Sequence, residues 1–213
     1  MGKRQLQQGS EVRQTIPAVA NNLRREKMKG LAFSEEMMRA WLDGRKSITR
    51  RLLNPQPDKV EAGVAFCEGR AISPKYKPGE SIYIKETWCP GPVLGAGSEK
   101  WCGSAVLYKA TDTEISASWR SPRFMPEWAS RSKALIVSVR PERVQSITPE
   151  EVKREGFVVR DFAGIGVLAL LGLTPETYME SVAMQEFQSL WETLHPGSRE
   201  KNDWVWRIEL EKI

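Results

Sequence analysis

The amino-acid sequence predicts a mixed α+β domain with short helices, one longer helix near the C-terminus and long loops. Helix starts are marked by Ser34, Thr148 and Thr174, residue types that cap helix N-termini, and proline follows the last two at the first helical position. Apolar residues alternate with polar ones over residues 204–211, and residues 81–86 contain isoleucine and tyrosine, which favour β-strands. Strands are therefore expected at both places.

The first helix is expected to run from Ser34 to Gly44. Two glutamates follow the cap, where the positive end of the helix dipole stabilises them. The apolar residues recur at spacings of three and four: Met37, Met38, Trp41 and Leu42. Beyond Gly44, a joint role for Lys46 and Thr49 requires a turn, because positions i and i+3 of a strand face opposite ways.

The remaining elements follow from caps, periodicity and breakers. Further strands are expected at residues 30–33, 105–110 and 134–139, and helices at 148–156 and 174–195. In the second helix, Thr148-Pro149-Glu150-Glu151 forms a capping box and Gly156 supplies the stop. Loops are expected around residues 54–75, 89–103 and 160–173, and His195 is expected only to end its helix.

Positive charge is concentrated at the N-terminus. The chain of 213 residues carries a formal net charge of +5. Residues 1–27 hold six basic and two acidic residues, a net of +4, which leaves +1 for residues 28–213. We interpret residues 1–27 as a flexible basic arm and residues 28–213 as a single domain, whose contacts with nucleic acid would depend on local clusters of basic residues.

Composition also limits the chemistry. Cys67, Cys89 and Cys102 make an odd set without a Cys-x-x-Cys pair, and His195 is the only histidine. We therefore expect a reducing cytoplasmic location, no disulfides, no metal and no cofactor. The most apolar run, residues 162–173, is too short to span a bilayer, so no membrane segment is expected.

The stretch after the first helix resembles the signature of the ASCH domain, a small β-barrel family related to the PUA RNA-binding domains. The matching residues are Gly44, Lys46, Ser47, Thr49 and Arg51. Other parts resemble the phage and prophage type of that family: residues 28–31, 77–80, 85–88, 125–131, 155–156 and 204–213. The resemblance implies one PUA-like barrel over residues 28–213, with insertions around the three expected loops.

The resemblance implies a pocket around this motif that binds RNA or a nucleotide or nucleoside. Lys46, Arg50 and Arg51 would contact phosphate, and an aromatic residue such as Trp88 would stack on a base. The expected ligand-binding residues are Gly44, Arg45, Ser47, Arg50, Arg51, Glu86 and Trp88.

The small ASCH amidohydrolases, which deacylate acetylated cytidine, imply an alternative. By that resemblance Thr49 is the nucleophile, Lys46 the base and Glu155 the acid or shuttle. Lys46 acts as a base only if burial lowers its pKa to about 7–8. The opposing interpretation is a Lys46–Glu155 salt bridge beside a ligand groove, with Thr49 donating a hydrogen bond. A phage interaction or assembly protein that retains only the fold is a further alternative.

Overall fold

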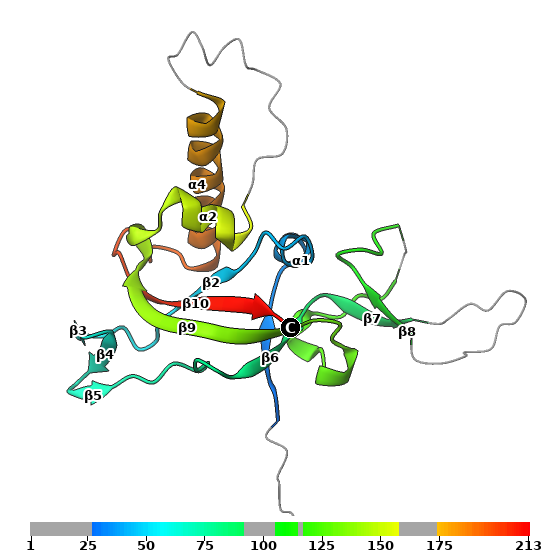
Figure 1. Cartoon of the computed structure of the whole chain (residues 1–213), viewed down its shortest axis with the longest axis horizontal. Helices are drawn as coiled ribbons and strands as arrows, with labels where there is room; N and C mark the ends of the chain where they lie inside the picture. The colour runs from blue at the N-terminus through cyan, green and yellow to red at the C-terminus, as the bar shows by residue number, and fades with distance from the viewer. Residues whose placement is uncertain (1–26, 92–104, 115–116, 158–173) are drawn as a thin grey trace, which may run out of the picture.

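The computed structural model describes residues 27–91, 105–114, 117–157 and 174–213, and within them the chain is a mixed α+β protein, as predicted. The largest sheet lies in the middle of Figure 1, with helices α2 (Pro149–Glu155) and α4 (Pro175–Leu194) to one side of it. Smaller sheets lie at its two ends. Nearly all of the predicted arm and the insertion at residues 160–173 lie outside the described residues.

The main sheet has five strands, of which only the first pair is parallel. Their order is β1 (Lys29–Ala32), β6 (Ser81–Lys85), β9 (Lys133–Arg143), β10 (Trp204–Lys212) and β2 (Ile48–Leu52). The strands predicted at residues 30–33, 81–86, 134–139 and 204–211 are confirmed as β1, β6, β9 and β10, although β9 is longer than expected.

Strand β10 is buried on both faces, although alternation of apolar and polar residues is typical of a strand with one buried face. Ile208 and Leu210 pack into the main core, and Val205 belongs to a second core with Phe187 of α4. Arg207 is buried too. Because α2 and α4 cover the second face, the side chains on that face, Val205 and Arg207, are withdrawn from water as well.

No backbone pairing joins β1 to β2 among the described residues, so the sheet does not close into a barrel through its ladders. Instead, the Arg51 guanidinium in β2 donates to the carbonyl oxygen of Ala32 in β1 over 2.7 Å. A side chain therefore bridges the two edge strands.

The helix boundaries follow the predicted caps. Helix α1 (Glu35–Leu42) begins after Ser34, whose hydroxyl accepts from the Met37 amide. Thr148 and Thr174 cap α2 and α4 in the same way. Gly156 ends α2 in the left-handed conformation, with φ of 103°.

The prediction of an irregular loop at residues 54–75 is wrong in part. Strands β3 (Lys59–Glu61), β4 (Val64–Cys67) and β5 (Arg70–Ala71) form a small antiparallel sheet there. Ala62–Gly63 and Glu68–Gly69 both have positive φ, as the favoured two-residue hairpin turns require. Gly63 and Gly69, which indicated a loop in the sequence, therefore lie in hairpin turns.

Residues 89–91, also expected to begin a loop, belong to strand β7 (Trp88–Gly91), which pairs with β8 (Ala105–Tyr108). The rest of that expected loop, residues 92–103, lies outside the described residues. Short 3-10 helices complete the structure: Pro122–Phe124, Glu127–Ala129 and Val144–Ser146.

Candidate functional site

Residues 45–48 do not form the turn that a joint role of Lys46 and Thr49 was expected to require, and Lys46 lies between α1 and β2 in a segment without regular secondary structure. Its backbone amide bonds to the Ala40 carbonyl at the end of α1, and Ile48 already begins β2. Thr49 is the second residue of that strand. The lysine side chain reaches the Ile48 carbonyl at the start of β2, and Lys46 and Thr49 line the same cavity without a turn between them.

The Lys46 ammonium is buried and uses its three donors within the protein. It donates to the carbonyl oxygens of Ile48 and Glu155, each over 2.8 Å. Its third partner is the Glu155 carboxylate, over 2.9 Å. The side chains of Lys46 and Glu155 are 1% and 5% exposed. An ammonium has three N–H groups, so this geometry satisfies the charged form.

Glu155 also binds a second cation. Arg50 in β2 donates to its other oxygen over 3.1 Å, and Arg50 further contacts Glu142 of β9 and Glu151 of α2. The Arg50 side chain is 0% exposed. This corrects the expectation that Arg50 contacts phosphate, because its guanidinium is surrounded by carboxylates.

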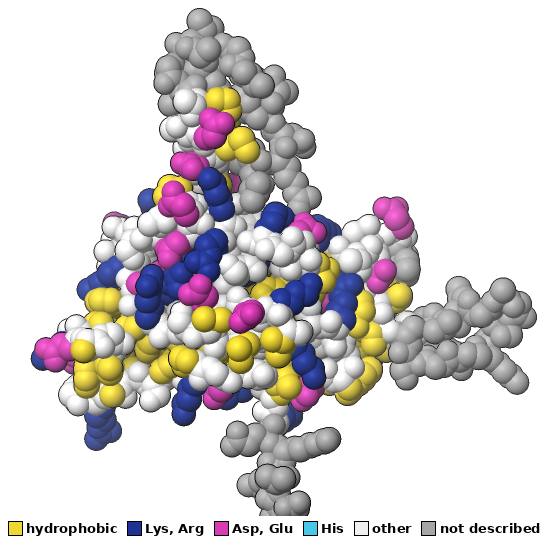
Figure 2. All heavy atoms as spheres, viewed as in Figure 1, with side chains coloured by type: hydrophobic (Ala, Val, Ile, Leu, Met, Phe, Trp, Pro, Cys, Tyr) yellow, Lys and Arg dark blue, Asp and Glu magenta, His cyan; other side chains and the backbone are white. Residues whose placement is uncertain are grey.

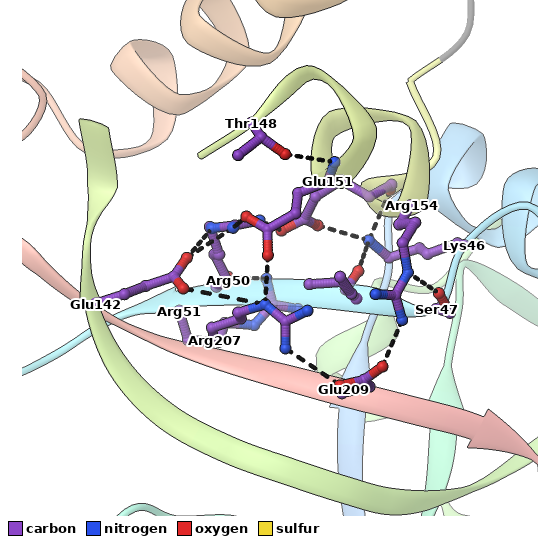
Figure 3. A network of polar contacts seen from close by, with 12 residues as sticks. Lys46, Ser47, Arg50, Arg51, Glu142, Thr148, Glu151, Arg154, Arg207 and Glu209 are labelled. Carbon is purple, nitrogen blue, oxygen red and sulfur yellow. Dashed lines mark hydrogen bonds and ion pairs between the residues drawn. The ribbon is translucent and has the colours of Figure 1, made fainter. Parts of the chain in front are cut away.

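These pairs are part of a larger network that joins α2 to the sheet, shown in Figure 3. Arg207 in β10 donates to Glu151 over 2.8 Å and to Glu209 over 3.2 Å. Arg154 of α2 donates to Ser47 over 3.0 Å and also binds Glu209. Figure 2 shows basic and acidic side chains alternating where α2 lies over the sheet. The network fixes α2, and with it Glu155, above β2.

Burial and charge shift several pKa values here. Burial lowers the pKa of Lys46, and Arg51 and Arg50 lower it further, while Glu155 opposes them. Burial also lowers the pKa of Arg51. Burial raises the pKa of Glu151, but Arg50 and Arg207 outweigh it and the net pKa is lowered. The hydrogen bond from Arg154 lowers the pKa of Glu209 to about 2.

Lys46, Thr49 and Glu155 converge on one cavity of about 340 Å³. Its walls are largely apolar and come from β1, α1, β2, α2 and α4. They include Phe33, Phe157, Phe187, Leu190, Trp191, Leu194 and His195. In the described part of the chain, no side-chain hydrogen bond holds the Thr49 hydroxyl. The cavity therefore offers a hydroxyl, a buried ion pair and aromatic surface to a ligand.

The other predicted residues divide into three groups. Arg51 lines the cavity. Gly44 follows the end of α1 with φ of 74°, Arg45 donates to the Gly156 carbonyl, and Ser47 accepts from Arg154. These last three support the site. Glu86 and Trp88, in contrast, do not line it.

Glu86 and Trp88 have structural partners elsewhere. Arg131 donates to both Glu86 oxygens, over 2.9 and 2.8 Å. Trp88 is buried beside Met125 and Ala129. Because neither side chain faces the cavity, we assign them to packing around β7, and the expectation of ligand contacts does not apply to this cavity.

The sequence interpretation missed the helical wall of the cavity. His195 was expected only to end α4; it does end that helix, but it also lines the cavity, with its ring 4.6 Å from that of Trp191. Burial lowers the pKa of His195, and Arg51 lowers it further. The apolar stripe of α4 was visible in the sequence, but a stripe does not identify what it covers.

No protein-family model matches this chain, and no curated protein or solved structure shows significant similarity to it. Across residues 27–91, 105–114, 117–157 and 174–213, no group of His, Cys, Asp and Glu side chains is arranged to hold a metal ion. None of the helices in those segments is both long and apolar enough to cross a membrane.

Proposed function

We propose that this chain is an ASCH-type, PUA-like domain that binds the base of a nucleoside, alone or within RNA, in the Lys46–Thr49–Glu155 cavity. The observation that carries the proposal is the convergence of these three side chains, which are spread over 110 residues of sequence, on one cavity. A volume of about 340 Å³ lies within the usual range for small-molecule sites.

The main sheet supports the assignment to this class. Its β1 and β2 edges are bridged by Arg51, a residue of the Gly44–Arg51 motif itself. We propose that this side-chain bridge takes the place of the last ladder of an ASCH-type barrel. The three-stranded sheet β3–β4–β5 and the β7–β8 hairpin are then insertions into that barrel.

The chemistry of the cavity suits a planar, polar ligand. Aromatic walls provide surface against which a base can stack, and stacking contributes about 1–3 kcal/mol per base. The Thr49 hydroxyl can both donate and accept a hydrogen bond. The Lys46 ammonium, already bound to three acceptors, supplies a fixed positive field rather than a mobile proton.

Binding is tested by calorimetric titration of the protein with cytidine and N4-acetylcytidine. Thr49→Val keeps the shape of the side chain but removes its hydroxyl, and we expect it to weaken binding by about 1–2 kcal/mol, or roughly tenfold. Thr49→Ser should bind as wild type does. Thr113→Val, at an exposed position outside the cavity, is the matched control. Unchanged affinity in Thr49→Val would contradict the proposal.

A second candidate is hydrolysis of an acylated nucleoside, and the lowered pKa of Lys46 favours it. Thr49 Oγ would attack the acyl carbon as neutral Lys46 takes its proton. The C–N bond would then break, the amine would leave with that proton, and water would hydrolyse the acyl-threonine. Glu155, bound to two cations, would position Lys46 rather than donate a proton.

Release of acetate from N4-acetylcytidine tests this candidate. The rate should rise with pH as Lys46 loses its proton, with a midpoint below the ordinary lysine pKa of about 10.5 because burial lowers it. Lys46→Met and Thr49→Val should each remove most of the turnover, and the double variant should be little worse. Wild-type turnover equal to that of Lys46→Met would leave binding alone as the function.

A further inference from the structure

A basic groove of about 800 Å³ lies beside the cavity. It is bordered by β1, β2 and β6 and by the chain around residues 72–76 and 121–123. Four of its lining residues are cations: Arg51, Lys75, Lys85 and Arg123. No aspartate or glutamate is among the described residues that line it. The groove therefore concentrates positive charge in a domain, residues 28–213, whose formal net charge is only +1.

The positive charge of the groove is not neutralised by ion pairs. In the described segments, no carboxylate forms a salt bridge with any of the four cations. Lys29, which is outside the groove, shows the contrast, since it binds Glu80 over 2.8 Å. Lys85 donates instead to the carbonyl oxygen of Arg123, over 2.6 Å. Burial lowers the pKa of Lys85, and the nearby Lys75 and Lys27 lower it further.

The groove and the cavity adjoin each other. They share three lining residues, Ala32, Arg51 and Pro122. Arg51 lies at this junction, where two of its donors bind the carbonyl oxygens of Ala32 and Arg50. A guanidinium has five N–H groups, so further donors remain for an anion at the mouth of the cavity.

We propose that the cavity and groove together bind a single-stranded nucleic acid, with one unstacked base in the cavity and its flanking phosphates along Arg51, Lys75, Lys85 and Arg123. This inference rests on the proposed function, because the cavity must accept the base. A base can enter only when it has left the helical stack, which favours a single strand over a duplex. Trp206, which also lines the groove and is only half-buried, provides aromatic surface for a neighbouring base.

The size of the groove argues against a free mononucleotide as the natural ligand. One phosphate would occupy the Arg51 junction and leave the other three cations without an anion. The groove has about 800 Å³ against about 340 Å³ for the cavity, so most of the site lies outside the space for the base. A strand of several nucleotides accounts for both parts.

The test compares a short single-stranded RNA, the matching DNA, the corresponding RNA duplex and free cytidine, each titrated over a range of salt concentrations. Single-stranded RNA should bind tighter than cytidine and duplex, and its log-log salt slope should be about −2 to −3 for four neutralised phosphates. In Lys75→Ala/Arg123→Ala the slope should become shallower by about 1.4, with affinity reduced roughly tenfold at low salt. Equal binding of DNA would show that the groove reads phosphate alone and would leave the inference standing.

The matched control is Lys201→Ala/Lys212→Ala, which removes the same charge at exposed positions outside the groove and should leave the slope unchanged. An oligonucleotide that binds no tighter than cytidine, or a slope that both double variants change equally, would overturn the groove inference. Cytidine binding that depends on Thr49 would then still support the proposed function. Conversely, a groove-dependent slope with no cytidine binding would overturn the cavity as the base site, and the proposed function with it.

Discussion

The Lys46 ammonium and the Glu155 carboxylate lie 109 residues apart in the chain and meet at 2.9 Å, with both side chains almost wholly buried. Arg50 binds the second Glu155 oxygen over 3.1 Å. A buried ion pair does not by itself stabilise a fold, because desolvation opposes the attraction. Its partners are nevertheless strongly coupled, since removing one leaves the other charge buried without compensation.

A double-mutant cycle measures this coupling. Lys46→Met and Glu155→Gln should each destabilise the protein by about 3 kcal/mol, and the double variant should cost less than the sum by about 1–3 kcal/mol. Lys153 and Glu180 form an exposed pair at 2.8 Å and serve as the control, with expected coupling of about 0.2–1 kcal/mol. Urea unfolding gives both values. Equal coupling in the two pairs would show that Lys46 and Glu155 are effectively solvated.

Gly156 connects the end of α2 to α1 and the site. A Cβ added there would lie 2.6 Å from Ala40 Cβ, and the residue has φ of 103°. Gly156→Ala should therefore cost more than the roughly 1–2 kcal/mol of left-handed strain alone. Gly197→Ala isolates that strain, because Gly197 has φ of 74° and nothing within 4 Å of its added Cβ. Thermal midpoints that fall equally for both variants would contradict the close approach at Gly156.

The acid stability of the protein should depend on Glu209. Its pKa is about 2 in the folded protein, against 4.5 for an ordinary glutamate. The stabilisation is therefore present above pH 4.5 and is lost as pH falls towards 2. We expect it to amount to about 1–3 kcal/mol, because solvent reduces the effect at a partly exposed site.

Urea titrations from neutral pH to pH 2 measure the contribution of Glu209. In Glu209→Gln the free energy of unfolding should fall less between about pH 4.5 and 2 than it does in wild type. Glu211→Gln, at an exposed position of the same strand, should not change this fall. If the loss of stability at low pH is the same in Glu209→Gln as in wild type, other carboxylates, such as Glu151, are responsible for the pH dependence.

Arg51 should matter to the edge of the sheet as well as to ligand binding. Arg51→Met removes the 2.7 Å hydrogen bond to Ala32 and should cost about 1–2 kcal/mol. Arg140→Met, at an exposed position in β9, should change stability by less than about 0.5 kcal/mol. Hydrogen exchange should be faster in β1 of Arg51→Met than in wild type. Unchanged exchange there would show that the bridge does not hold β1 and β2 together.

Local signals in the sequence determined most of the secondary structure. Ser34, Thr148 and Thr174 cap their helices, and Gly156 ends α2, because each of these interactions spans only three or four residues of chain. The sequence also supplied Lys46, Thr49 and Glu155, but through resemblance to a motif rather than through periodicity. The hairpins of β3–β4–β5 were missed because glycine marks loops and tight turns alike.

Only the tertiary structure decided which side chains meet. Arg50 was expected to be available for phosphate, yet packing of α2 on β2 surrounds it with Glu142, Glu151 and Glu155. His195 became part of the cavity because α4 packs beside α2. Such contacts join residues about 100 positions apart, and their energies depend on burial and on the exact partner. No local pattern encodes either, so the sequence predicted the elements and packing determined the site.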